Sequence, residues 1–194
     1  MAYEIVVIGA SLGGLDAVSE LLGQLPRGFP LPVAVCQHRT SIPHEGSLAS
    51  LWQQVTSLRV GDAEDKMAIE PSRVYVAPAD YHLLVESRGL FALTTDPPVL
   101  WARPSIDVLF ESAAETYGAA VIGVILTGAS ADGAQGLKAV RDHGGCALVQ
   151  DPATAECAVM PRAALDATAV NHVMGLQEIG RIIAALAGPA GAPR

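Results

Sequence analysis

Residues 3–14, YEIVVIGASLGG, pass from a β-branched segment directly into a glycine-rich turn. The apolar run at 3–8 predicts a buried strand, and the spacing of leucine and valine over 13–25 predicts an amphipathic helix after it. A strand, a tight turn and a helix form the opening unit of an α/β fold. The same order returns along the chain, so we expect strands that alternate with helices.

The remaining elements follow from the same patterns. Residues 121–127, VIGVILT, are continuous and apolar, as a parallel strand buried on both faces should be. Short runs at 73–77, 82–86 and 90–94 are separated by hairpin-length segments, which predicts antiparallel pairing in part of this region. Further strands are predicted at 32–36, 146–149 and 169–173, and further helices near 48–55, after Pro104, and at 133–143, 161–167 and 176–186.

Together these elements predict one α/β domain over residues 1–188. Its architecture should be a three-layer, doubly wound sandwich, with a mostly parallel sheet and an antiparallel hairpin excursion. We expect residues 189–194, PAGAPR, to form a disordered tail. In such sheets ligands bind at the carboxyl ends of the strands, near the switch in strand order. Functional residues should therefore lie directly after strands.

Composition narrows the class of protein. The 194 residues carry a net charge of −8, which argues against nucleic acid as a partner, because backbone binding needs a cationic surface. Three scattered cysteines without paired spacing argue against a disulfide framework or a zinc site. No apolar run approaches the roughly 18 residues of a spanning helix. We expect a cytoplasmic protein with no metal, no cofactor and no membrane insertion.

Three strand ends carry side chains suited to nucleophilic catalysis. Ser11 lies in GASLG, a G-x-S-x-G pattern on a strand-to-helix turn that exposes a serine hydroxyl. The helix beginning at Gly13 would aim free amides at an oxyanion beside it. His38 follows the second strand, and Asp132 follows the long apolar strand. We predict a triad in which Asp132 orients His38 and His38 accepts the Ser11 proton.

Simpler interpretations compete for each of these residues. A glycine-rich turn also binds nucleotide phosphates, although Ser11 stands where the dinucleotide fingerprint needs glycine. A lone histidine is more often structural than catalytic, and an aspartate before glycine at a helix start is usually an N-cap. The other histidines lack metal-ligand spacing or a strand-end position, and we expect structural or solvated roles for His44, His82, His143 and His172.

Six segments resemble one known family. They are GASLGG at 9–14, QH at 37–38, VYVAPAD at 74–80, RPSID at 103–107, VILTGASADGA at 124–134 and MPRAA at 160–164. In consistent order over about residues 4–187, they resemble the catalytic domain of the chemotaxis protein-glutamate methylesterase (CheB) family. The resemblance implies hydrolysis of glutamate γ-methyl esters on chemoreceptors, with deamidation of glutamines in some members. It places the family's triad on Ser11, His38 and Asp132.

The chain departs from the family pattern beside these residues. Leu12 stands where members usually carry Thr, Ala129 where they usually carry Met, and Arg39 with Thr40 where they often carry Met-Pro. We expect Leu12, Gly13, Arg39 and Ala129 to line the substrate cleft. We also expect the departures from the family pattern to affect substrate identity or reaction rate. Members often carry a receiver domain; we expect none here, which leaves a separate receiver protein as a candidate partner.

Three hypotheses remain open. The first is a methylesterase acting on methylated chemoreceptor helices or an analogous signalling protein. The second is a weakly active or non-catalytic interaction module that docks on signalling helices. The third is an esterase or amidase for a small molecule. Labelling by a serine-directed fluorophosphonate separates the first two, and a panel of model esters separates the first from the third.

Overall fold

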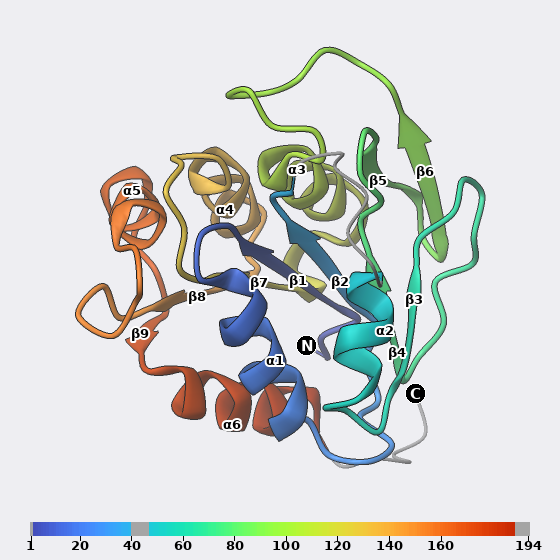
Figure 1. Cartoon of the computed structure of the whole chain (residues 1–194), viewed down its shortest axis with the longest axis horizontal. Coiled ribbons are helices and arrows are strands. Elements are labelled where there is room, and N and C mark those ends of the chain that lie inside the picture. Colours follow the sequence, from blue (N-terminus) through green and yellow to red (C-terminus); the bar gives the residue numbers. More distant parts are fainter. Residues whose placement is uncertain (1, 40–46, 189–194) are drawn as a thin grey trace.

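The structure is a computed structural model that describes residues 2–39 and 47–188. Its centre is a seven-stranded sheet in which every neighbouring pair is parallel (Figure 1). In spatial order the strands are β3 (Arg59–Asp62), β4 (Arg73–Val76), β2 (Val33–Gln37), β1 (Ile5–Ala10), β7 (Val121–Ile125), β8 (Cys146–Gln150) and β9 (His172–Met174). The chain leaves β1 toward β2 and later returns to the other side of β1 as β7, so the strand order reverses at β1.

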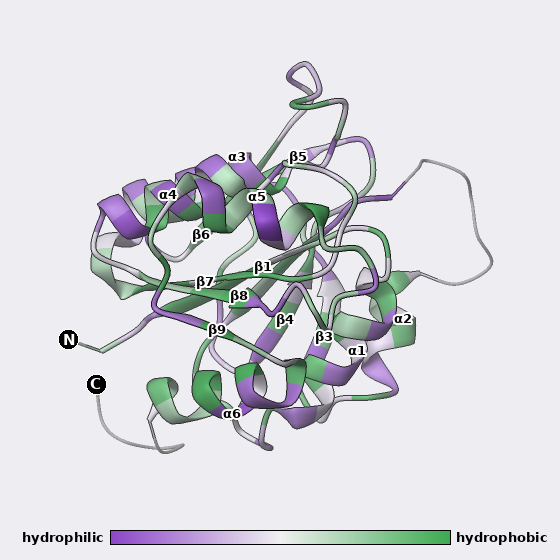
Figure 2. Cartoon of the chain, turned by 90° about the vertical axis from the view of Figure 1, so that its left-hand side faces the viewer, coloured by the Kyte–Doolittle hydropathy of each residue, from purple (hydrophilic) through white to green (hydrophobic). Residues whose placement is uncertain are grey.

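Helices cover both faces of this sheet. One face carries α1 (Gly14–Gln24), α2 (Leu48–Gln53) and α6 (Leu176–Ala187), and the other carries α3 (Ile106–Tyr117), α4 (Ala134–Asp142) and α5 (Val159–Ala167). Figure 2 shows the two helical layers above and below the strands. The predicted three-layer, doubly wound α/β architecture is therefore confirmed. A 3-10 helix, Gly118–Ala120, leads from α3 into β7.

The two hydrophobic cores follow from the period of two along each strand. In β1, Ile5 and Val7 enter the core under α3, whereas Val6 and Ile8 enter the core under α1. All six residues of β1 are buried, as are all five of β7. A strand buried on both faces reads as a continuous apolar run, which is why these strands could be recognised in the sequence.

The antiparallel excursion is a separate two-stranded sheet, β5 (His82–Ser87) and β6 (Leu90–Thr94). The preceding strand, β4, does not join it: β4 pairs parallel with β2 and β3, and the segment 78–80 connects two sheets. The reason is burial, because Val74, Tyr75 and Val76 are all covered, as in a strand inside the main sheet.

Three further details differ from the sequence predictions. The edge strand β3 was not predicted, because its residues RVGD are partly exposed and show no apolar pattern. Strand β1 continues through Gly9, where a Cβ would lie 2.4 Å from Ile106 Cγ2, so glycine admits α3 rather than ending the strand. Strand β9 begins at His172, three residues later than predicted. The predicted tail, residues 189–194, lies outside the described residues, as does His44.

Among the helices that the structure describes, none has the length and apolar composition required to cross a bilayer.

The close crossing of α3 and α4 depends on Gly136. A Cβ at this position would lie 2.6 Å from Phe110 Cβ and 2.9 Å from Asp107 Cα, and backbone cannot yield as a side chain tip can. We expect Gly136→Ala to lower the free energy of unfolding by about 1–3 kcal/mol, the usual range for overpacking. Urea denaturation of the variant and of wild type measures this change in the free energy of unfolding. Gly61→Ala is the control, since its Cβ meets Arg73 Nη2 at an ordinary 3.6 Å and should change stability by less than about 0.5 kcal/mol.

Candidate active site

Three residues predicted to form the site lie at the carboxyl edge of the sheet, where the strand order reverses. Ser11 follows β1 directly and donates its amide to Thr127 O, after β7, at 3.0 Å. His38 follows β2 and donates its amide to Ala10 O, in β1, at 3.0 Å. Asp132 lies between β7 and α4. The parallel register of β2, β1 and β7 therefore brings together residues that are far apart in the chain.

The histidine and the aspartate are in direct contact. His38 Nε2 lies 2.6 Å from Asp132 Oδ2, and the Asp132 side chain is fully buried while that of His38 is 13% exposed. With Asp132 ionised, Nε2 carries the proton and donates it to the carboxylate. Nδ1 is then the ring nitrogen left to accept a proton from another group.

The serine is close to this pair but not bonded to it. Ser11 is partly exposed at the start of the turn into α1, where Gly14 N donates to Ser11 O at 2.9 Å and Gly13 adopts a φ of 75°. Within residues 2–39 and 47–188, Ser11 Oγ has no hydrogen-bond partner. The expected hydrogen bond from nucleophile to base is therefore not formed in this structure.

The N-terminus of α3 holds the Asp132 carboxylate. Ser105 Oγ donates to Oδ1 at 2.8 Å, Ile106 N to Oδ2 at 2.7 Å and Asp107 N to Oδ1 at 3.1 Å. Burial opposes ionisation of Asp132, but the hydrogen bonds from His38, from the two amides and from Ser105 outweigh it and lower its pKa. A negatively charged group is also favoured at a helix N-terminus. Asp132 is therefore ionised and fixed in orientation.

A second buried carboxylate completes a reciprocal arrangement. Asp107, in the first turn of α3, accepts amide hydrogens from Gly133 at 2.8 Å and Gly136 at 2.7 Å, at the start of α4. Burial chiefly, and then the Asp132 charge, raise the pKa of Asp107 to about 6, although the two amides act in the opposite direction. Each helix thus binds a carboxylate supplied by the other helix or its leading segment.

Sequence reasoning did not assign a role to Gln37. This residue is 4% exposed, and its Nε2 donates to Ser11 O at 2.8 Å and to His38 O at 3.0 Å. One side chain therefore ties the backbone of the serine to that of the histidine. The sequence did contain a feature that marks Gln37: it is a polar residue at the end of an otherwise apolar strand, and polar residues are unusual in buried positions.

Sequence reasoning also passed over the contacts of His82. His82 is 1% exposed; its Nδ1 accepts from Ser105 N at 3.1 Å, and its Nε2 lies 3.2 Å from Pro97 O. Both ring nitrogens are committed to backbone groups, so the ring serves structure. Its role is to hold the residue that bonds Asp132, a connection that spacing along the chain does not reveal.

The four residues predicted to line the substrate cleft are placed differently from one another. Leu12, beside Ser11, is 55% exposed, and Ala129 is exposed as well. Gly13 is partly exposed. Arg39 instead directs its guanidinium to the end of β4, where Nη2 donates to Ala77 O at 3.0 Å.

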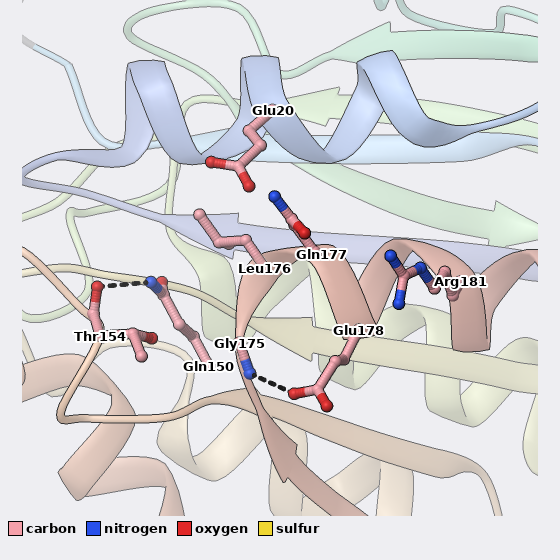
Figure 3. A pocket seen from close by; sticks show the side chains of 8 residues that line it. All are labelled: Glu20, Gln150, Thr154, Gly175, Leu176, Gln177, Glu178 and Arg181. Carbon is pink, nitrogen blue, oxygen red and sulfur yellow. Dashed lines mark hydrogen bonds between the residues drawn. The ribbon is translucent and has the colours of Figure 1, made fainter.

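A separate hollow lies between α1 and α6, with a volume of about 520 Å³ (Figure 3). None of the three predicted catalytic residues lines it, and Figure 3 shows polar side chains from several elements around it. Its lining residues are Glu20, Gln150, Thr154, Gly175, Leu176, Gln177, Glu178 and Arg181. The described residues contain no cluster of three or more histidine, cysteine, aspartate or glutamate side chains arranged to hold a metal ion.

A doubly wound parallel sheet with serine, histidine and aspartate at its carboxyl edge is an architecture found among serine hydrolases of the α/β class. Residues 6–183 match the family model described as CheB methylesterase. The chain therefore belongs to the CheB methylesterase family.

Individual relatives agree with this assignment. The chain is 45% identical over 182 residues to a Leptospira interrogans protein provisionally named protein-glutamate methylesterase/protein-glutamine glutaminase, and the match covers 94% of each chain. It is 44% identical to protein-glutamate methylesterase FrzG of Myxococcus xanthus, over 92% of this chain and 53% of the relative. The crystal structure of the Thermotoga maritima CheB methylesterase catalytic domain superposes with a TM-score of 0.90 at 32% identity, covering 96% of this chain and all of that one.

The raised pKa of Asp107 predicts a pH-dependent stability. Between about pH 4 and pH 6 the folded state binds more protons at Asp107 than the unfolded state, so its contribution to stability falls as pH rises through this range. Asn at this position keeps an oxygen for the amides of Gly133 and Gly136 and removes the charge. The stability of Asp107→Asn relative to wild type should rise between pH 4 and pH 6, by on the order of 2–3 kcal/mol, and then level off.

Urea denaturation at half-unit pH steps checks this expectation. Asp16→Asn, on the exposed surface of α1, controls for the loss of any carboxylate. A stability difference between Asp107→Asn and wild type that falls as pH rises would contradict the assignment.

Proposed function

We propose that this protein is a protein-glutamate methylesterase, which hydrolyses glutamate γ-methyl esters on a chemoreceptor or analogous signalling protein and releases methanol. The observation that carries the proposal is the 2.6 Å contact between His38 and the buried, charged Asp132, beside Ser11 in the strand-to-helix turn. Family membership and the names of the relatives support it. The name of the Leptospira relative also supports deamidation of glutamine at the same site.

The chemistry assigns one role to each residue. Ser11 Oγ attacks the ester carbonyl while His38 Nδ1 takes its proton, and the Asp132 carboxylate stabilises the resulting imidazolium through Nε2. His38 then protonates the leaving methoxide, and a water molecule hydrolyses the acyl-enzyme by the reverse sequence. Because Ser11 Oγ is not bonded to His38 in the free protein, rotation about its Cα–Cβ bond accompanies substrate binding.

The backbone N–H of Leu12, the residue after the nucleophile, is the proposed hydrogen-bond donor to the oxyanion of the tetrahedral intermediate. Ser11 O is held by Gly14 N and by Gln37 Nε2. In a trans peptide the N–H points opposite to the carbonyl, so the Leu12 N–H faces away from those groups. Among the described residues it has no hydrogen-bond acceptor, and it is the amide that nucleophile turns of this type use in the oxyanion hole.

The setting of the reaction is part of the proposal. Cys36, Cys146 and Cys157 are all free thiols, which fits the reducing cytoplasm. The substrate is a methylated signalling protein, a separate receiver protein is the candidate regulator, and no step above requires a metal or a cofactor.

Removal of the nucleophile or the base tests the mechanism. Ser11→Ala and His38→Ala should each lower methanol release from a methylated chemoreceptor by about 10⁴- to 10⁶-fold, as in comparable triads. Because the residues act as one unit, the double variant should be hardly slower than either single one. Ser19→Ala, at a partly exposed position of α1 whose hydroxyl donates to Leu15 O, should leave turnover unchanged. Additive losses, or labelling of Ser11→Ala by a fluorophosphonate, would contradict the assignment.

Gln37 fixes the orientation of the Leu12 N–H, because its side chain donates to the carbonyl of the same peptide, Ser11 O. Leucine at this position fills a similar volume but cannot donate to Ser11 O or His38 O, so the Ser11–Leu12 peptide is free to turn. We expect Gln37→Leu to lower kcat by about 10- to 100-fold, less than full removal of an oxyanion donor, with little change in KM. Gln135→Leu, at an exposed position of α4, is the matched control. A loss confined to KM would assign Gln37 to substrate binding instead.

A further inference from the structure

The segment between β6 and α3 carries an exposed apolar tip. This segment projects beyond the rest of the molecule at the top of Figure 1, and its turn is formed by residues 99–102. The side chain of Trp101 is 99% exposed and that of Leu100 is 54% exposed. Single exposed apolar residues are common on protein surfaces, but tryptophan is rarely left entirely in water. We call these two side chains the Leu100–Trp101 tip.

The backbone of this tip is strained. Val99 N donates to Ala102 O at 3.1 Å and Ala102 N to Val99 O at 2.8 Å, which defines a two-residue hairpin turn. Leu100 has a φ of 46° and Trp101 a φ of 68°. Turns with positive φ at both central residues strongly prefer Asn-Gly, because side chains that branch or extend rarely adopt this conformation. The folded chain gains almost no burial from Trp101 and only about half of that available from Leu100, so the tryptophan in particular points to a contact outside the chain.

The tip is also held at a defined place relative to the active site. Arg103 Nη1 donates to Thr95 O at 2.9 Å and to Asp96 O at 3.1 Å, which braces the two arms of the segment. Ser105, four residues after Trp101, bonds the Asp132 carboxylate through its hydroxyl. Four residues span at most about 14 Å, so the Cα of Trp101 lies within that distance of the Ser105 Cα.

We propose that the Leu100–Trp101 tip is a docking element for the protein that carries the ester, which it contacts through an apolar patch beside the modified glutamate. This inference rests on the proposed function. Leu12, 55% exposed next to Ser11, supplies a second apolar contact from the opposite helical layer. A substrate protein would then touch the enzyme at two places around the reacting bond.

The size and charge of the surface favour this occupant. A tryptophan and a leucine bury a few hundred Å² at most, well below the roughly 800 Å² per partner of a stable interface. A second copy of this chain would have to bury a larger area to form a stable dimer. A small contact area suits a substrate, which must leave after each turnover. A net charge of −8 opposes attraction to an anionic membrane surface.

Two substrates with the same ester bond test the proposal. One is a purified chemoreceptor cytoplasmic fragment with radiolabelled glutamate γ-methyl esters, and the other is a short peptide with one such ester. Trp101→Ala should raise KM for the fragment at least about 10-fold and leave kcat unchanged, while hydrolysis of the peptide is unaffected. Val173→Ala, at an exposed apolar residue on the edge strand β9, should change neither.

A second variant separates docking from folding. The double change Leu100→Asn and Trp101→Gly installs the preferred turn residues, so Tm should rise by a few degrees while KM for the fragment rises as in Trp101→Ala. A more stable protein that binds its protein substrate less well is the expected signature.

The outcomes that overturn the proposal are distinct. Equal losses on fragment and peptide would show that Trp101 supports the site itself. No loss on either, with an active wild type, would remove the docking role and leave the proposed function intact. A wild type inactive on both esters would overturn the proposed function as well. Trp101-dependent binding to anionic vesicles, or a dimer lost in Trp101→Ala, would assign the tip to a membrane or to a second copy.

Discussion

Two buried carboxylates hold the start of α3 against the start of α4, and the candidate active site depends on this junction. Asp132 accepts amides from α3, and Asp107 accepts amides from Gly133 and Gly136. Two neighbouring carboxylates cannot both ionise freely in a buried place, and their environments push their pKa values apart. Asp132 keeps its charge because it accepts hydrogen bonds from His38 and from the hydroxyl of Ser105, whereas the pKa of Asp107 rises to about 6.

The second constraint lies on the other side of the histidine. The Gln37 amide donates to the carbonyls of both Ser11 and His38, while its Oε1 is buried without a hydrogen-bond partner among the described residues. An unsatisfied buried oxygen costs about 1–3 kcal/mol, which an apolar side chain would avoid. The two carbonyl contacts give the reason for a glutamine here: it holds the turn at Ser11 and the end of β2 in one geometry.

Much of this organisation could be predicted from sequence. The buried strands β1 and β7 are continuous apolar runs, and a polar residue directly after such a strand must lie at the carboxyl edge of a parallel sheet. Ser11 and His38 directly follow strands, whereas Asp132 lies in the loop after β7 and could be selected only because it completes a serine, histidine and aspartate set. The edge strand β3 could not be predicted, because a half-exposed strand of four residues has no apolar period.

The sequence by itself determined the fold class, the order of most elements and the placement of Ser11, His38 and Asp132 after strands of the sheet, because these depend on local periodicity and on residue type after strands. Only the tertiary structure decided which nitrogen of His38 meets Asp132, which groups hold that carboxylate and where the Leu100–Trp101 tip stands. Asp132 and its partners at the N-terminus of α3, Ser105 included, are 25 to 27 residues apart, and His38 is 94 residues away. Contacts at such separations are fixed by the packing of helices on the sheet, which no local pattern records.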